Sequence, residues 1–202
     1  MQRTRSIITA LACLAAMTVA TAGFAGTYPQ DHNAWSIGFG LGGGSAGLSF
    51  DGGAITTDRT GGPMASFRVG FPLNKQVSLG LESNGWSKSE DISGVTGTVT
   101  FTATTFGAAF FPSEGLVLRG GLGLGQTKFS ASSGNVTVSN TKTGLGLTYG
   151  IGYEFRLTRR FALGPQLDGG FSSFDAADGL PKGNANWVGA GLEFNWYLLP
   201  KQ

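Results

Sequence analysis

The chain has 202 residues, enough for one domain of ordinary size, and it combines 35 glycines with only 13% charged residues. Its hydrophobic content of 41% is too high for a disordered chain of this kind, and no collagen-like triplet is present. Once Arg3 and Arg5 are set aside with the N-terminal segment, 12 basic residues face 12 acidic ones, which argues against nucleic-acid binding.

Residues 1–25 have the pattern of a cleaved secretory signal peptide. Two arginines near the start are followed by an apolar run over residues 7–19, and the small residues after it place cleavage after Ala22 or Ala25. The run is too short for a membrane-spanning helix, which needs about 20 apolar residues. Cys13 is the single cysteine and lies inside this segment, so we expect no disulfide and no thiolate site in the mature chain.

From residue 34 onward, large apolar residues alternate with glycine, polar or charged residues at a period of two, which is the pattern of β-strands. The clearest example is 143–171, where two such strands are joined by about four residues and predict a tight antiparallel hairpin. The same alternation predicts eight strands, at about residues 35–42, 66–71, 77–82, 98–111, 116–125, 144–156, 161–171 and 188–196.

The fourth of these strands has no clean phase. Phe101 and Phe111 fall on one parity, whereas Phe106 and Phe110 fall on the other. A β-bulge would reconcile the two sets, because it adds one residue to one strand of a pair. The sequence does not place such a bulge.

The connections between the predicted strands alternate between long and short. Long polar loops are predicted at about 43–62, 87–97, 130–141 and 172–184, and short links at 72–76, 112–115 and 157–160. Short turns at one end and long loops at the other are typical of transmembrane barrels, whose tilted strands have about ten residues. We therefore predict an all-β fold: an eight-stranded antiparallel up-and-down transmembrane β-barrel over 34–202, with 26–33 as a periplasmic leader.

Seven charged residues of the predicted strands all lie on the face opposite the large apolar residues. In a membrane barrel the apolar face meets lipid and the polar face lines the interior, and an arginine facing lipid at mid-membrane would cost about 2–4 kcal/mol. An eight-stranded barrel has room for interior side chains only, so these charges are predicted to pack as a network without a wide channel. They are Arg68, Glu82, Arg119, Glu154, Arg156, Asp168 and Glu193. Lys128 is the exception, because it falls on the apolar face; it lies at a strand end, where its aliphatic side chain can reach out to water.

Aromatic residues near the strand ends predict two girdles at the membrane interfaces. The predicted members are Trp35, Phe71, Phe110, Phe111, Phe155, Phe161, Trp196 and Tyr197 on the turn side, and Trp86, Phe171 and Trp187 near the long loops.

With these features, the chain resembles the eight-stranded outer-membrane β-barrel proteins of the OmpA/OmpX type over about 34–196. The resemblance is carried by the signal peptide, by hairpins such as F-R-V-G-F-P-L-N-K-Q-V-S-L-G-L and F-G-A-A-F-F-P-S-E-G-L-V-L-R-G, and by the last strand, G-A-G-L-E-F-N-W. It implies localisation in the cell outer membrane after secretion through the inner membrane. It also implies contact with outer-membrane lipid and lipopolysaccharide and insertion by the outer-membrane assembly machinery; we expect a monomer.

The last strand also looks like the assembly signal of such proteins, which has a glycine, a hydrophobic residue three positions on and an aromatic residue two positions later. The matching positions are Gly191, Phe194 and Trp196. The chain departs from the usual pattern because it continues through Y-L-L-P-K-Q, which leaves Tyr197 as an alternative to Trp196.

No catalytic, metal or cofactor site is predicted. The glycine runs keep the alternation of strands and no helix follows them, so they do not predict a phosphate-binding loop. His32, the single histidine, precedes the first strand and is expected at the periplasmic rim or in a flexible end. Asp175 and Asp178 alone are weak evidence for calcium. Glu154, Asp168 and Glu193 fit structural ion pairs better than acid–base catalysis.

The sequence therefore favours a non-enzymatic outer-membrane barrel with a structural or surface-interaction role in the cell envelope, with its loops as the contact surface. A small passive porin-like channel, or a conduit for hydrophobic solutes, is the first alternative. A lipid-modifying enzyme is less favoured, and a soluble lipocalin-like binder is a structural alternative.

Overall fold

The structure is a computed structural model that describes residues 32–134, 136–176 and 182–198. The predicted signal peptide, and the predicted leader up to residue 31, lie outside these ranges. In the described residues, no helix is both long and apolar enough to cross a membrane. The long strands are β1 (Trp35–Phe50), β3 (Thr60–Pro72), β4 (Val77–Ile92), β5 (Val95–Phe110), β6 (Leu116–Ser133), β7 (Val136–Tyr153), β9 (Phe161–Phe174) and β10 (Gly183–Leu198).

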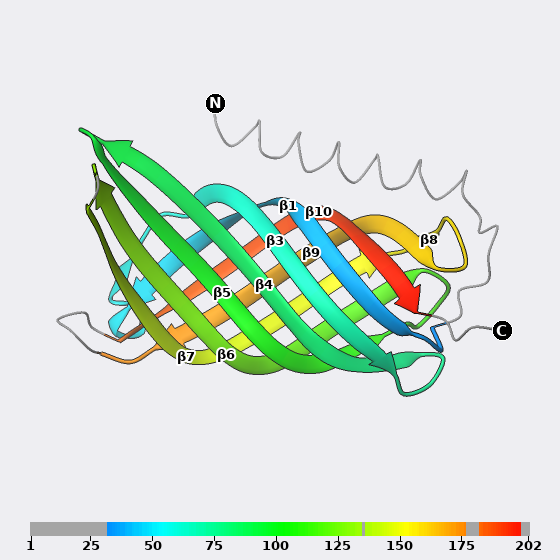
Figure 1. The fold of residues 1–202 in the computed structure, drawn as a ribbon. Helices are drawn as coiled ribbons and strands as arrows, with labels where there is room; N and C mark the ends of the chain where they lie inside the picture. The colour runs from blue at the N-terminus through cyan, green and yellow to red at the C-terminus, as the bar shows by residue number, and fades with distance from the viewer. Residues whose placement is uncertain (1–31, 135, 177–181, 199–202) are drawn as a thin grey trace, which may run out of the picture.

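These eight strands form one closed antiparallel barrel (Figure 1). Each long strand pairs with the next one along the chain, and β1 also pairs with β10, from Trp35 opposite Leu198 to Phe50 opposite Gly183. Two-residue strands β2 (Ile55–Thr56) and β8 (Phe155–Arg156) extend the pairing of β1 and β9, and a single 3-10 turn, η1 (Asp51–Gly53), precedes β2. The predicted eight-stranded up-and-down barrel is confirmed.

The two ends of the barrel differ in height. One end, which we call the short-turn end, holds the first residue of β1 and the last residue of β10 (Figure 1). The three short connections, 73–76, 111–115 and 157–160, lie at the same end. At the other end, called the tall end, β4 to β7 run far beyond their neighbours. Pairing of β3 with β4 stops at Met64 and Trp86, whereas β4 and β5 remain paired up to Ile92 and Val95.

Three of the long loops predicted from the sequence are therefore mostly strand. β1 continues to Phe50 within the loop predicted at 43–62, and the loops predicted at 87–97 and 130–141 are the tips of two hairpins. The β4–β5 hairpin closes through Ser93 and Gly94. Their φ angles of 54° and 82° are left-handed and match the two-residue turns that hairpins favour. Polar composition indicated a loop here because these strand tips stand in water, where polar residues suit a strand equally well.

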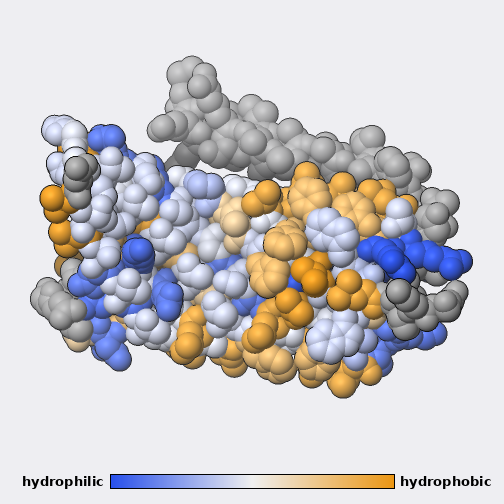
Figure 2. Space-filling view, in the orientation of Figure 1, coloured by the Kyte–Doolittle hydropathy of each residue, from blue (hydrophilic) through white to orange (hydrophobic). Residues whose placement is uncertain are grey.

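The polarity of each strand face changes with height. On β5 the outward row begins at the short-turn end with Phe110 and Phe106 and continues as an unbroken series of threonines, while the inward row gains Phe101 and Val99. Figure 2 shows the same change on the surface: hydrophobic side chains gather on the half near the short-turn end, and the tall end is mostly neutral to hydrophilic. The outward threonines are Thr104, Thr102, Thr100, Thr98 and Thr96.

This change of polarity removes the need for a bulge in the fourth strand. β5 pairs residue for residue with both neighbours, from Val77 opposite Phe110 to Ile92 opposite Val95 on one side. Phe106 and Phe110 face lipid, whereas Phe101 and Phe111 point inward on the other parity and are buried. The proposed bulge was wrong. The two sets of phenylalanines differ in parity because the polarity of each face changes along the strand, and not because the inward and outward positions shift.

We call the hydrophobic outer surface on the half near the short-turn end the apolar belt. Above it, neighbouring strands are linked on their outer face by hydroxyl groups. Ser87 and Thr100 lie 3.1 Å apart across β4 and β5, and Ser89 and Thr98 lie 2.8 Å apart. Ser132 and Thr137 make the same 2.8 Å contact between β6 and β7. Lys128, the predicted exception in phase, projects outward from this polar zone, where a charge remains hydrated.

The position of the belt predicts how two outward sites on β6 respond to charge. Leu122 is 60% exposed within the apolar belt, and Gln126 is exposed four residues closer to the tall end. We expect Leu122→Arg to lower the free energy of unfolding in lipid vesicles by about 2–4 kcal/mol, the cost of an arginine facing mid-membrane lipid. Gln126→Arg should change it by less than about 0.5 kcal/mol. Denaturant titration measures both, and equal effects would contradict this boundary.

Candidate functional site

The lumen is filled by a network of ion pairs that crosses the barrel. Glu193 on β10 contacts two arginines, Arg68 from β3 through one carboxylate oxygen and Arg119 from β6 through the other. Arg68 also binds Glu82 across β3 and β4 at 3.2 Å, and Arg119 binds Asp168 of β9 at 2.6 Å. Five charges from five strands thus form one continuous chain, with Glu193 at its centre.

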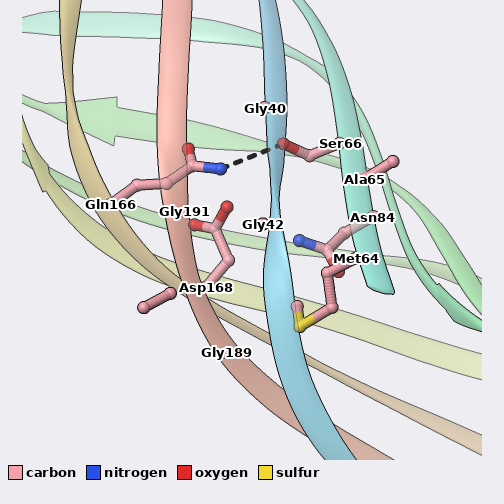
Figure 3. Close-up of a pocket in the computed structure, with 11 residues that line it drawn as sticks. Gly40, Gly42, Met64, Ala65, Ser66, Asn84, Gln166, Asp168, Gly189 and Gly191 are labelled. Carbon is pink, nitrogen blue, oxygen red and sulfur yellow. Dashed lines mark hydrogen bonds between the residues drawn. The ribbon is translucent and has the colours of Figure 1, made fainter. Parts of the chain in front are cut away.

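The glycines on the inward face of β1 make this network sterically possible. Gly40 lies between Ser66 on β3 and Glu193 on β10 in the sheet register. A Cβ at Gly40 would collide with the side chains of Ser66 and Gln166, which meet in front of it through a 3.4 Å hydrogen bond (Figure 3). Gln166 in turn accepts a 3.1 Å hydrogen bond from Arg119, so the amide joins the network to the β1 wall.

A second buried cluster closes the short-turn end. Glu154 accepts hydrogen bonds from Asn195, at 2.7 Å, and from the hydroxyl of Tyr197. The guanidinium of Arg156 lies 3.5 Å above the centre of the Tyr197 ring, a cation–π arrangement. His32 is only 4% exposed and stacks on Phe111 with their ring centres 3.6 Å apart. The histidine therefore belongs to the barrel plug, not to a flexible end.

An aromatic layer closes the lumen toward the tall end. It consists of Trp86, Phe101 and Trp187, which stack with ring centres 5.2 and 6.1 Å apart and are at most 4% exposed. The indole nitrogen of Trp187 donates a 2.7 Å hydrogen bond to Asn84, which lies toward the ion network. The prediction that Trp86 and Trp187 belong to an interface girdle was wrong, because both lie on the inward parity of their strands. It was also wrong for Phe111 and Tyr197, which are buried in the cluster at the short-turn end.

Little free space remains between these layers. The cavity beside Arg68, Glu82 and Arg119 has a volume of about 20 Å³, and the one beside Asp168 and Gln166 has about 10 Å³. A cavity needs roughly 10–15 Å³ to hold one water molecule, so each of these has room for about one. Above the aromatic layer the lumen widens into a cavity of about 310 Å³.

The structure places the seven predicted interior charges in two groups. Five belong to the ion network, and Glu154 and Arg156 belong to the cluster at the short-turn end. Lys142 lies between the loop predicted at 130–141 and the strand predicted from residue 144; it is a further inward cation and is 6% exposed. The strand alternation carried past the belt identifies it, because Lys142 has the same parity as the inward residues of β7.

The predicted assembly-signal residues lie on the strand that closes the barrel. Trp196 is 43% exposed on the outer face and packs against the ring of Phe161 at 5.0 Å, and Phe194 is half-buried on the same face. The alternative residue Tyr197 points inward, and Gly191 lies on the same parity of β10. Within the described residues, no three histidine, cysteine or acidic side chains are grouped as metal ligands. Asp178 lies outside those residues.

The chain has detectable likeness to known outer-membrane proteins. The family model described as "Outer membrane protein beta-barrel domain" matches residues 9–195. Among solved structures, the chain is similar to Ail, the attachment invasion locus protein of Yersinia pestis, solved with the heparin analogue sucrose octasulfate. The identity is 19% and the TM-score 0.54, covering 80% of this chain and 99% of Ail.

It is also similar to Neisserial surface protein A, with 14% identity and a TM-score of 0.54, covering 79% of this chain and 95% of that protein. At these identities the two likenesses show a shared fold alone. No curated protein sequence matches the chain.

The central position of Glu193 predicts a large effect of removing its charge. Glu193→Gln leaves two buried arginines without their shared anion, so we expect a loss of about 3–5 kcal/mol in the free energy of unfolding. Glu90→Gln is the matched control, because Glu90 is 62% exposed in its ion pair with Lys88 and should cost at most about 1 kcal/mol. Denaturant titrations of both variants in the same vesicles make the comparison. Similar losses of free energy would contradict the central role of Glu193 in the network.

Proposed function

Because this chain belongs to the outer membrane protein β-barrel domain family, we propose that it is a closed, non-enzymatic barrel of the outer membrane that acts through its tall end. In this role the apolar belt contacts outer-membrane lipid and lipopolysaccharide, and the tall end is the contact surface outside the cell. Barrels of this kind have short turns in the periplasm and longer connections outside, which supports this orientation.

The filled lumen is the observation that carries this proposal. Three successive layers occupy the cross-section: the His32–Phe111 and Tyr197–Glu154 cluster, the ion network centred on Glu193, and the aromatic layer. A porin-like path would need all three to open, and the cavities between them are of the size of single water molecules. A structural or surface-interaction role therefore has more support than a channel or a solute conduit.

The shape of the tall end supports a role in contacts. β4 to β7 form paired hairpins well beyond the belt, with Ser93 and Gly94 at one tip, so this surface is a fixed sheet with a hydroxyl-rich outer face. The single histidine is buried at the opposite end of the barrel and does not reach the outer rim, where lipid-modifying chemistry would take place. A monomer remains our expectation.

The last strand is proposed to carry the assembly signal read by the outer-membrane assembly machinery. Of the two aromatic candidates, Trp196 lies on the lipid-facing side of β10, whereas Tyr197 is buried and bonded to Glu154. A residue that points out of the sheet fits the signal better, so Gly191, Phe194 and Trp196 are the proposed set.

Conductance tests the closed lumen directly. Purified protein in planar bilayers should show no large, steady single-channel conductance. Trp187→Ala should behave in the same way, because the ion network and the short-turn cluster remain below the aromatic layer. A large, steady conductance of the unmodified protein would overturn the proposal in favour of a channel.

Cysteine labelling in intact cells tests the orientation. The only native cysteine is Cys13, in the predicted signal peptide, so a processed chain gives no background. With a membrane-impermeant maleimide, Ser93→Cys at the tall end should react in intact cells, and Asn74→Cys at the short-turn end only after permeabilisation. The reverse result would contradict the orientation, and labelling of the unmodified protein would show that the signal peptide is retained.

A further inference from the structure

The closed barrel leaves unexplained the cavity at its tall end, above the aromatic layer. Its volume of about 310 Å³ lies at the lower end of the range for small-molecule sites. Its apolar walls come from Trp86, Phe101, Val99, Leu48 and Ile92. These side chains belong to three different strands, β1, β4 and β5, and converge on one space.

The floor of this cavity is the aromatic layer, which makes it a dead end. Trp86 and Phe101 stack at an interplanar angle of 14° and present one flat aromatic surface. Directly beneath them the third ring, Trp187, is fully buried and fixed to Asn84. A flat aromatic floor favours a ring-bearing molecule, because aromatic groups gain from offset stacking beyond the area that they bury.

Trp86 also has a hydrogen-bond donor without a partner. Its side chain is 4% exposed, and its indole nitrogen has no acceptor among the described residues. This nitrogen lies against Gly62 of β3, at the height where β3 and β4 are no longer paired. Buried indole N–H groups usually find a partner, so an acceptor that enters beside Gly62 would satisfy this one.

The barrel wall is parted beside the cavity. Thr60–Pro63 pair with β1 alone, and Ser87–Ile92 pair with β5 alone, so the pairing of β3 with β4 ends at Met64 and Trp86. The cavity is lined by Thr60 on one side of this gap and by Lys88 and Glu90 on the other. The gap lies above the apolar belt, and it therefore gives the cavity an entrance from outside the cell.

The charges at the entrance exclude one class of ligand. Lys88 and Glu90 are paired at 2.8 Å and cancel each other, which leaves the carboxylate of Asp58 as the remaining charge on the lining. A ligand anion would meet this carboxylate without a free cation of the lining to balance it. An uncharged molecule avoids that repulsion and suits the apolar walls.

We propose that this cavity binds one small, uncharged aromatic molecule that carries a hydrogen-bond acceptor and enters from outside through the gap between β3 and β4. The molecule stacks on the Trp86–Phe101 surface, and its acceptor approaches the indole nitrogen of Trp86. This inference goes beyond the proposed surface role, and its test does not depend on conductance.

Indole fluorescence provides the test. In the W35F/W196F variant the two belt tryptophans are removed, and Trp86 and Trp187 remain as reporters within the barrel. The full chain, folded in lipid nanodiscs, is titrated with 4-nitrobenzamide, an uncharged aromatic amide whose nitro group quenches indole emission. We expect saturable quenching, and weaker binding of the anionic analogue 4-nitrobenzoate.

Neighbouring residues of β5 provide a matched pair of variants. A Cβ at Gly97 would meet nothing closer than 3.9 Å, so Gly97→Phe can fill the cavity without a backbone clash and should abolish saturable quenching. Thr98→Phe adds the same side chain to the outer face and should leave it unchanged. Trp86→Phe, read through Trp187, should raise Kd about five-fold, the loss of one ordinary net hydrogen bond.

Quenching that rises linearly and is equal in the Gly97→Phe and Thr98→Phe variants would reflect partition into lipid and would overturn the proposal. Equal or tighter binding of 4-nitrobenzoate would overturn the assignment to an uncharged ligand. Heat-modifiable migration on SDS gels verifies that each variant is folded, and the Thr98→Phe variant keeps the comparison decisive because it carries the same added bulk.

Discussion

The strict alternation of side chains between the two faces of each strand is the constraint on which the rest of this structure depends. A barrel strand has one outward and one inward row, and pairing with both neighbours holds that assignment along the whole strand. On β5 the assignment is unbroken over sixteen residues, from the tall-end tip to the short-turn end. The sequence must therefore satisfy lipid, packed interior and water in turn without changing parity.

That constraint explains why the interior is polar and why it is full. Within the belt the inward row cannot be bulky and apolar on every strand, since eight strands leave little space. β1 contributes glycines to that space, and its neighbours contribute long charged side chains, so Arg68 and Glu193 meet across β1. Removing charges from water has a large cost, and the network offsets it by giving each arginine more than one anion.

Above the belt the polarity of the two rows is reversed: the outward row is polar and the inward row is apolar. Outward threonines and serines meet water and one another, while Phe101 and Trp86 turn the inward row into an apolar floor. No lipid surrounds the barrel at this height, so its strands need not all stay paired, and β3 separates from β4 beside that floor. A cavity with an entrance is therefore a consequence of tall, unequal strands on a filled barrel.

Much of this fold is determined by sequence alone, because a period of two is a local property that each strand expresses independently. Residues such as Leu122, Arg119 and Glu193 reveal by parity that they face lipid or lumen, and the number of strands follows from counting. The height of the membrane along each strand is a different matter, because it depends on closure of the whole ring. For that reason the tips of β4 to β7 were predicted to be loops, and Trp86 and Trp187 were assigned to a lipid-facing girdle.

Only the tertiary structure decided which charges meet and where the lumen is blocked. Glu193 binds Arg68 and Arg119 because the register between β10, β1 and β3, and the tilt that brings β6 opposite, set their heights. The stacking of Phe101 on Trp187 likewise joins β5 and β10, which are distant in the chain. Parity is encoded within each strand, but the partner across the lumen is fixed only when the ring closes.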